Sequence, residues 1–242
     1  MTMTSKDIRR LARESMQGNW GVSILICLIF VFLRGGYSVD LDVEELETLF
    51  GELPKFLSVY LTVVGSIASI LGFVNFILGG VLELGHTAFL LKQQDRQALS
   101  VKELFSQFHR FGQGFLQALL RGLYVFLWSL LFVIPGVVKT YSYFMTPYIM
   151  IDYPELSANE AITWSRQAMD GHKFDLFCLH LSFIGWAILS LLTLGIGDLF
   201  LLPYMYASYA VFYRNVICPK IQREILEEDP SAQVLPPIVD AR

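Results

Sequence analysis

SVYLTVVGSIASILGFVNFILGGVL, residues 58–82, is a run of twenty-five residues without a charged side chain. A helix needs about 20 predominantly apolar residues to cross the hydrocarbon core of a bilayer. The run therefore predicts a transmembrane helix over Ser58–Leu82. Asn75 is its only amide residue, and Glu83 marks the predicted end of the span.

The composition of the whole chain supports a membrane protein. Hydrophobic residues make up 54% of the 242 residues and charged residues only 17%, with nineteen Phe, eleven Tyr and four Trp. So many aromatic side chains are difficult to bury in a soluble core of this size, whereas lipid and the headgroup region accommodate them. Nothing supports nucleic-acid binding. The three cysteines form no C-x-x-C pair, so we expect no disulfide framework.

Five further apolar runs predict additional spans. The first follows an arginine-rich segment but has no small-x-small cleavage site, so we interpret it as a retained span rather than a signal peptide. Pro135-Gly136 and the Gly-Ile-Gly-Asp run at 195–198 separate later spans, because proline removes a donor and glycine permits a reversal. The predicted spans are Trp20–Val39, Phe115–Ile134, Val137–Ile151, Phe174–Leu194 and Leu199–Ile217.

The placement of the positive charges orients these six spans. Lys and Arg accumulate in cytoplasmic loops, while acidic residues contribute little to orientation. With both termini in the cytoplasm, fifteen of the eighteen Lys and Arg residues lie on the inner side. The three outer ones are Arg34, Lys55 and Lys139, and the external loop at 35–57 is acidic. We therefore predict a multi-pass protein of the cytoplasmic membrane with cytoplasmic N- and C-termini.

An internal repeat appears in three inner segments. A Ser or Thr is followed three residues later by a carboxylate and fourteen residues later by a glycine: Thr4, Asp7 and Gly18; Ser100, Glu103 and Gly114; Ser157, Glu160 and Gly171. This spacing is typical of a capping box that begins a helix and a glycine that ends it in a left-handed turn. Apolar residues in each segment recur at helical spacing, so each stripe is expected to lie on the inner membrane surface.

The predicted fold class is all-α. We expect six transmembrane helices arranged as three hairpins, each preceded by a cytoplasmic amphipathic interfacial helix. The repeats comprise residues 4–39 with 58–83, residues 100–151 and residues 157–217. Residues 1–217 form a single transmembrane domain. Residues 218–242 form a cytoplasmic tail, with a short helix followed by disorder.

From Val101 to Tyr213 the chain resembles a bacterial integral membrane family known as domain of unknown function 975. The residues that carry the resemblance are Leu127-Trp128, Ile134-Pro135-Gly136, Lys139, Tyr141, Tyr143, Glu160-Ala161, Ser165, Met169, Gly171, Phe183, Gly185-Trp186, Gly195-Ile196-Gly197, Pro203-Tyr204 and Phe212-Tyr213. The resemblance implies a bacterial membrane protein and no particular activity.

Polar residues within the spans are candidate functional residues, because they are costly in lipid. Arg121 lies about two turns into the third span. We predict that it either contacts Glu83 or faces an inward-opening aqueous cavity. His180 is interpreted as a neutral imidazole bonded to a neighbouring helix or as a proton relay, and Asn75 is a further candidate. Glu83-x-x-His86 has the spacing of a metal pair, but no second motif accompanies it. We interpret it as an interfacial pair facing water and expect no metal and no cofactor.

Tyrosines concentrate in the second half of the chain. Tyr206, Tyr209 and Tyr213 share one helical face, and Tyr141 and Tyr148 lie seven residues apart. They are expected either to line a shared polar interior or to form an interfacial belt.

These features lead to three functional hypotheses. The preferred one is a non-enzymatic accessory or membrane-homeostasis protein whose cytoplasmic amphipathic segments bind membrane lipids or a protein partner. The second is a small-solute transporter or channel, and the third is an enzyme acting on lipids. No nucleophile elbow, Walker loop or H-E-x-x-H motif is present, so we expect no enzymatic activity. A polar cavity that reaches Tyr206 and Arg121 would favour the second hypothesis.

Overall fold

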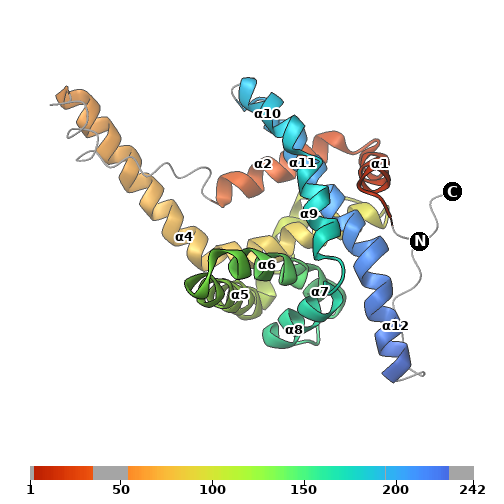
Figure 1. The fold of residues 1–242 in the computed structure, drawn as a ribbon. Coiled ribbons are helices and arrows are strands. Elements are labelled where there is room, and N and C mark those ends of the chain that lie inside the picture. Colours follow the sequence, from red (N-terminus) through yellow and green to blue (C-terminus); the bar gives the residue numbers. More distant parts are fainter. Residues whose placement is uncertain (1–2, 35–53, 194, 229–242) are drawn as a thin grey trace.

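The computed structural model describes residues 3–34, 54–193 and 195–228, and within these ranges the chain is helical with no strand (Figure 1). The predicted external loop lies largely outside them. The helices are α1 (Ser5–Met16), α2 (Trp20–Leu33), α4 (Lys55–Gln94), η1 (Val101–Phe105), η2 (Phe108–Arg110), α5 (Phe111–Leu131), α6 (Val133–Ser142), α7 (Thr146–Asp152), α8 (Ala158–Ala168), α9 (Lys173–Leu181), α10 (Ile184–Leu192), α11 (Asp198–Phe212), η3 (Tyr213–Ile217) and α12 (Cys218–Glu228).

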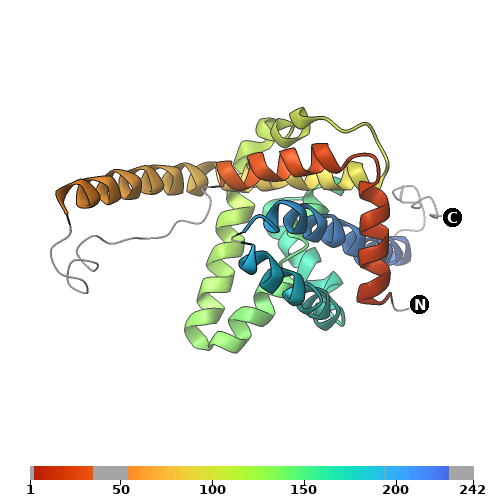
Figure 2. The same ribbon diagram turned by 90° about the horizontal axis from the view of Figure 1, so that it is seen from above.

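The first copy of the repeat forms an elbow. Thr4 and Asp7 make the predicted capping box at the start of α1. Gly18 follows α1 with φ +82°, a conformation that L-residues with a Cβ rarely adopt. The chain turns there by 103° between α1 and α2, as Figure 2 shows at the end nearest the N-terminus. The predicted turn at Gly18 is therefore confirmed.

The third copy repeats this local structure. Ser157 and Glu160 form a capping box at the start of α8, and Gly171 has φ +84°. The next helix, α9, begins two residues after Gly171, just as α2 begins two residues after Gly18. Two copies 153 residues apart thus use the same cap and the same left-handed glycine.

The second copy differs, and the prediction of a capped α-helix there is wrong. Residues 101–110 form two short 3-10 helices instead. Glu103 pairs with Lys92 of α4. Gly114 lies inside α5 without a positive φ, and a Cβ on Gly80 of α4 would overlap its carbonyl. In this copy the glycine permits a close crossing of two helices, which is a use of small residues common in membrane proteins.

Helix α4 extends beyond the predicted span. Its 40 residues are about 60 Å long, twice the hydrocarbon thickness of a bilayer. Glu83 was expected to end the span, but the helix continues for eleven residues beyond it to Gln94, and the Glu83 carboxylate is paired with Arg121. The first half of α4 projects away from the other helices, while α2 lies along the second half (Figure 2).

Among the described residues, three segments are long and apolar enough to cross a membrane: Gly72–Gln94, Val101–Leu131 and Lys173–Leu192. The bent pair of α1 and α2 makes a fourth if it is counted as one span. The predicted fourth span at 137–151 is divided into α6 and α7 by a break at 143–145. The predicted boundary at residue 217 is not a break either, because the π-helical turn η3 joins α11 to α12. Residues 229–242 lie outside the described part of the chain.

The apolar stripes of the first and third copies are buried in protein, so the prediction that they lie on the membrane surface is wrong. Ile8, Ala12 and Met16 are at most 2% exposed, and α1 packs against α11. Ala161 and Ile162 of α8 are also buried. Ile8, Ala12, Met16 and Ala161 belong to one hydrophobic core that several helices form together.

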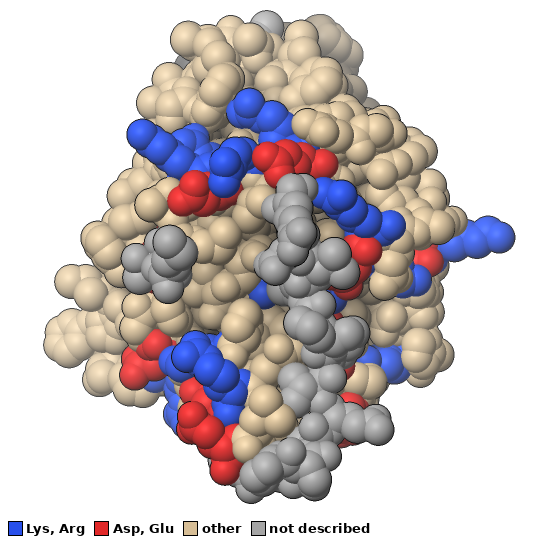
Figure 3. All heavy atoms as spheres, turned by 90° about the vertical axis from the view of Figure 1, so that its right-hand side faces the viewer, with Lys and Arg blue, Asp and Glu red and all other residues tan. Residues whose placement is uncertain are grey.

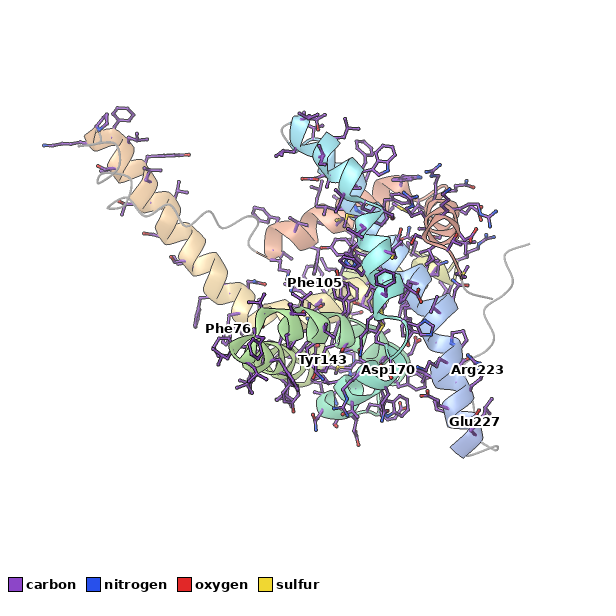
Figure 4. The ribbon with its side chains drawn as sticks, in the orientation of Figure 1. Phe76, Phe105, Tyr143, Asp170, Arg223 and Glu227 are labelled. Atoms are coloured by element: carbon purple, nitrogen blue, oxygen red, sulfur yellow. The ribbon has the colours of Figure 1, made fainter. Side chains whose placement is uncertain are left out.

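Apolar and charged surfaces separate along the molecule. Large exposed hydrophobic side chains lie on the first half of α4, the second half of α5, the start of α6, and α10. Figure 3 shows a different face, where Lys, Arg, Asp and Glu gather in groups. In Figure 4, Asp170, Arg223 and Glu227 lie at the end formed by α8 and α12, and Phe76 lies at the opposite side where α4 meets α5.

Candidate functional site

A cavity of about 640 Å³ lies between α2, α4, α5, α11 and the segment from α6 to α7. Its walls combine apolar side chains with charged, imidazole and hydroxyl groups. The polar residues that line it are Arg34, Asn75, Glu83, His86, Thr87, Arg121, Thr140, Tyr148, His180, Tyr206 and Tyr209. Seven of the nine residues singled out from the sequence are therefore brought together with Arg34, His86 and the two threonines.

The wall of this cavity contains an ion pair. Arg121 Nη2 donates to both carboxylate oxygens of Glu83, at 2.8 and 2.6 Å. The Glu83 side chain is 16% exposed and the Arg121 side chain 20%, so the pair is largely shielded but still reaches the surface of the cavity. The predicted contact between these residues is confirmed. Both residues also line the cavity; whether it opens inward to water, the alternative expected for Arg121, stays a prediction.

Arg34 makes the charge of the cavity unequal. It follows α2, and its guanidinium carbon lies 5.6 Å from the centre of the Phe30 ring. Among the described residues no carboxylate pairs with it. Two guanidinium groups and one carboxylate thus line the cavity, so among its described lining residues the positive charges exceed the negative ones by one when both histidines are neutral.

Histidine and tyrosine rings form one wall. His86 stacks on Phe30 with ring centres 4.2 Å apart, and the Tyr206 ring meets the His86 ring edge-on at 4.8 Å. Farther along this wall, the ring centres of Tyr209 and His180 lie 4.9 Å apart. His86 is only 4% exposed, so the interpretation of Glu83 and His86 as an interfacial pair facing water is wrong for the histidine. Burial against Phe30 is the physical reason.

Three other sequence candidates have different surroundings. Tyr213 is fully buried outside the cavity, where its hydroxyl donates to Asp152. Tyr141 also lies outside the lining and packs edge-on against His180. The expected bond from His180 to a neighbouring helix is wrong, because Nδ1 contacts the Leu176 carbonyl of its own helix at 2.9 Å. The shared tyrosine interior is therefore formed by Tyr148, Tyr206 and Tyr209.

Asn75 occupies the end of the cavity toward the projecting half of α4. Its Oδ1 is buried and has no hydrogen-bond partner in the described structure. A buried amide oxygen without a partner is costly. This oxygen lies against Gly79 of the same helix.

A second polar cluster lies outside the cavity and was missed in the sequence. Arg214 of η3 is 7% exposed and binds both Asp95, at 2.7 Å, and Asp152. In the sequence, Arg214 is only one of the fifteen inner positive charges that orient the spans. The three residues are separated by more than 50 positions each, so no local motif could have identified the cluster. It links the end of α4 to α7 and η3, which is a structural role.

No group of three or more His, Cys, Asp or Glu side chains within the described ranges is arranged to hold a metal ion. Glu83 and His86 lie one helical turn apart, but Glu83 is engaged by Arg121 and His86 by aromatic rings. The chemistry available in the cavity is therefore that of charge pairing and hydrogen bonding.

Comparison with known proteins identifies a family. Comparisons with curated proteins and with solved structures find no match. A scan of protein families matches residues 1–142 and 133–220 to one family, which together cover most of the chain. The chain belongs to the family described as protein of unknown function (DUF975).

Proposed function

We propose that the protein binds a small polar solute in the central cavity and acts as a transporter or channel. The observation that carries this proposal is the cavity of about 640 Å³, in which Glu83, Arg121 and Arg34 meet between apolar helices. Pockets of this size are typical of small-molecule sites. Charged side chains within membrane helices are costly and mark candidate functional sites, and three charged residues line this cavity.

The charges favour an anionic solute. Arg121 is engaged by Glu83, whereas Arg34 has no carboxylate partner among the described residues. A small carboxylate or phosphate would supply the missing negative charge and accept hydrogen bonds from the guanidinium. The hydroxyl groups of Tyr148 and Tyr209, which also line the cavity, offer further donors.

For the membrane topology we propose six crossings, arranged as three hairpins, with both termini in the cytoplasm of a bacterial cell. The positive charges support this orientation. The capped helices α1 and α8 would then lie on the cytoplasmic side, together with α12.

A second candidate is the accessory role in membrane homeostasis, through lipid or protein binding at the cytoplasmic face. One observation favours it: Phe105, Phe108 and Phe111 remain between 37% and 46% exposed along η1, η2 and the start of α5. These rings would insert into a membrane surface or contact a protein partner. Both candidates are non-enzymatic.

The proposal can be tested by flux into proteoliposomes that contain the purified full chain. Acetate, lactate and inorganic phosphate are suitable probes, because each is small and anionic. We expect saturable uptake of at least one probe. Arg121→Leu should abolish this uptake while the protein remains folded.

Lys92→Leu is the matched control. It breaks another ion pair of α4, in which Lys92 lies 2.8 Å from Glu103, outside the cavity. We expect Lys92→Leu to retain uptake. Absence of saturable uptake for all three anions, or an equal loss in both variants, would contradict the proposal.

A further inference from the structure

A second cavity, of about 320 Å³, lies at the elbow between α1 and α2. The elbow contributes Arg13 and Trp20, and the hairpin of α10 and α11 contributes the other side with Trp186, Leu189, Phe200 and Tyr204. None of its lining residues belongs to the solute cavity. The two cavities lie against different faces of α11.

The wall formed by the hairpin is apolar and open. Trp186 is 54% exposed and Phe200 is 58% exposed. Such side chains are unfavourable in water but suit the hydrocarbon of a membrane. An acyl chain can therefore occupy this part of the cavity.

One cation stands at the other end. The guanidinium carbon of Arg13 lies 5.9 Å from the centre of the Tyr204 ring. None of the hydrogen bonds or ion pairs of the described residues involves Arg13. The tyrosine ring is held in place, because its hydroxyl donates to the Arg9 carbonyl at 3.0 Å. The guanidinium thus stands over an ordered aromatic ring with its donors available.

The other two arginines of α1, Arg9 and Arg10, are already engaged. Arg9 donates to the Ser182 carbonyl and lies over the Phe183 ring. Arg10 pairs with Asp7 on the same helix. Arg13 is therefore the residue of this helix best placed to bind an anion at the cavity.

We propose that this cavity binds one anionic glycerophospholipid, with its phosphate on Arg13 and one acyl chain against Trp186 and Phe200. A guanidinium binds phosphate oxygens in bidentate geometry. Trp20, Trp186 and Tyr204 are side chains of the type enriched at membrane interfaces, where headgroup and hydrocarbon meet. Basic pockets between membrane helices suit anionic headgroups. This inference is independent of solute binding, because the two cavities share no residue.

The test uses the delipidated full chain in detergent, with native mass spectrometry to count bound lipids. Titration with palmitoyl-oleoyl phosphatidylglycerol should give one binding event that is tighter than any with the matching phosphatidylcholine. Arg13→Gln should weaken that event about fivefold, the effect of one basic residue at an anionic lipid surface. Glycerol 3-phosphate should not displace the lipid, because it has no acyl chain.

Arg10→Gln is the control, since it removes a charge from the same helix at an exposed, ion-paired position. We expect it to leave phosphatidylglycerol binding unchanged. Arg13→Lys keeps the charge and tests the bidentate geometry; it should bind more weakly than the wild type. Equal binding of the two lipids, or equal losses in Arg13→Gln and Arg10→Gln, would overturn the proposal.

Discussion

Arg121 Nη2 lies 2.6 Å from Glu83 Oε2, although the two residues are 38 positions apart in the sequence. The contact joins α4 to α5 at the wall of the solute cavity.

The two members of this pair should respond differently to removal. Glu83→Ala leaves a guanidinium that cannot lose its proton, whereas Arg121→Leu leaves a carboxylate that can become neutral by taking one up. We expect Glu83→Ala to lower stability by about 2 kcal/mol, less than for a fully buried pair because both side chains are partly exposed. Arg121→Leu should cost less. Fluorescence-detected thermal unfolding in detergent measures both; a larger loss in Arg121→Leu would refute the asymmetry.

The crossing of α4 and α5 depends on two glycines. A Cβ on Gly80 would overlap the Gly114 carbonyl, and a Cβ on Gly114 would lie 2.9 Å from the Val81 Cα. Overpacking of this kind typically costs about 1–3 kcal/mol. We therefore expect Gly80→Ala and Gly114→Ala to lower the apparent Tm. Gly112→Ala, in the same helix with no atom within 4 Å, should be neutral or stabilising.

A side chain at Gly18 or Gly171 should lower stability, although no atom lies within 4 Å of a Cβ built at either position. Their φ values of +82° and +84° make alanine unfavourable by about 1–2 kcal/mol. Gly18→Ala and Gly171→Ala should each reduce stability, as measured by thermal unfolding. Gly21→Ala, within α2 and also in open space, is the control. If all three variants behave alike, backbone conformation is not what selects these glycines.

The capping box of α8 predicts a loss of stability in acid. The Ser157 hydroxyl and backbone N–H hold the pKa of Glu160 below its ordinary value of 4.5. The folded protein therefore binds this proton less readily than the unfolded chain, so the contribution is fully present above pH 4.5 and is lost as the pH falls through the lower folded pKa. Glu160→Gln removes the titration. The variant should lose less stability than the wild type between about pH 5 and about pH 3, the interval in which this carboxyl group titrates.

The local structure of the repeat was predictable because it depends on neighbouring residues. A hydroxyl three residues before a carboxylate and a glycine at a fixed distance determine the start and end of α1 and α8 without help from the rest of the chain. Ser100 has the same spacing, yet Glu103 binds Lys92 instead of completing the cap. A tertiary contact therefore overrode the local pattern in the second copy.

The candidate site was predictable only in part for a similar reason. The pairing of Glu83 with Arg121 follows from two charges at matching depth in adjacent spans, so the sequence was sufficient. His86 was misassigned because its burial depends on Phe30 of another helix. The Arg214 cluster requires three helices to meet, and helical periodicity gives no information on such a meeting.

The most direct test of the proposed cavity is charge-selective modification of a cysteine placed in it. Gly122 of α5 lines the cavity, and no atom lies within 4 Å of a Cβ built there, so Gly122→Cys fits. In a background without the native cysteines Cys27, Cys178 and Cys218, its reaction rates with anionic and cationic methanethiosulfonate reagents are compared. Because two guanidinium groups face one carboxylate, the account predicts that the anionic reagent reacts faster, and that Arg34→Gln removes this preference. Gly112→Cys, outside the cavity on the same helix, should show no preference. An unreactive cysteine at 122, or equal rates with both reagents, would contradict a solute cavity with a net positive charge.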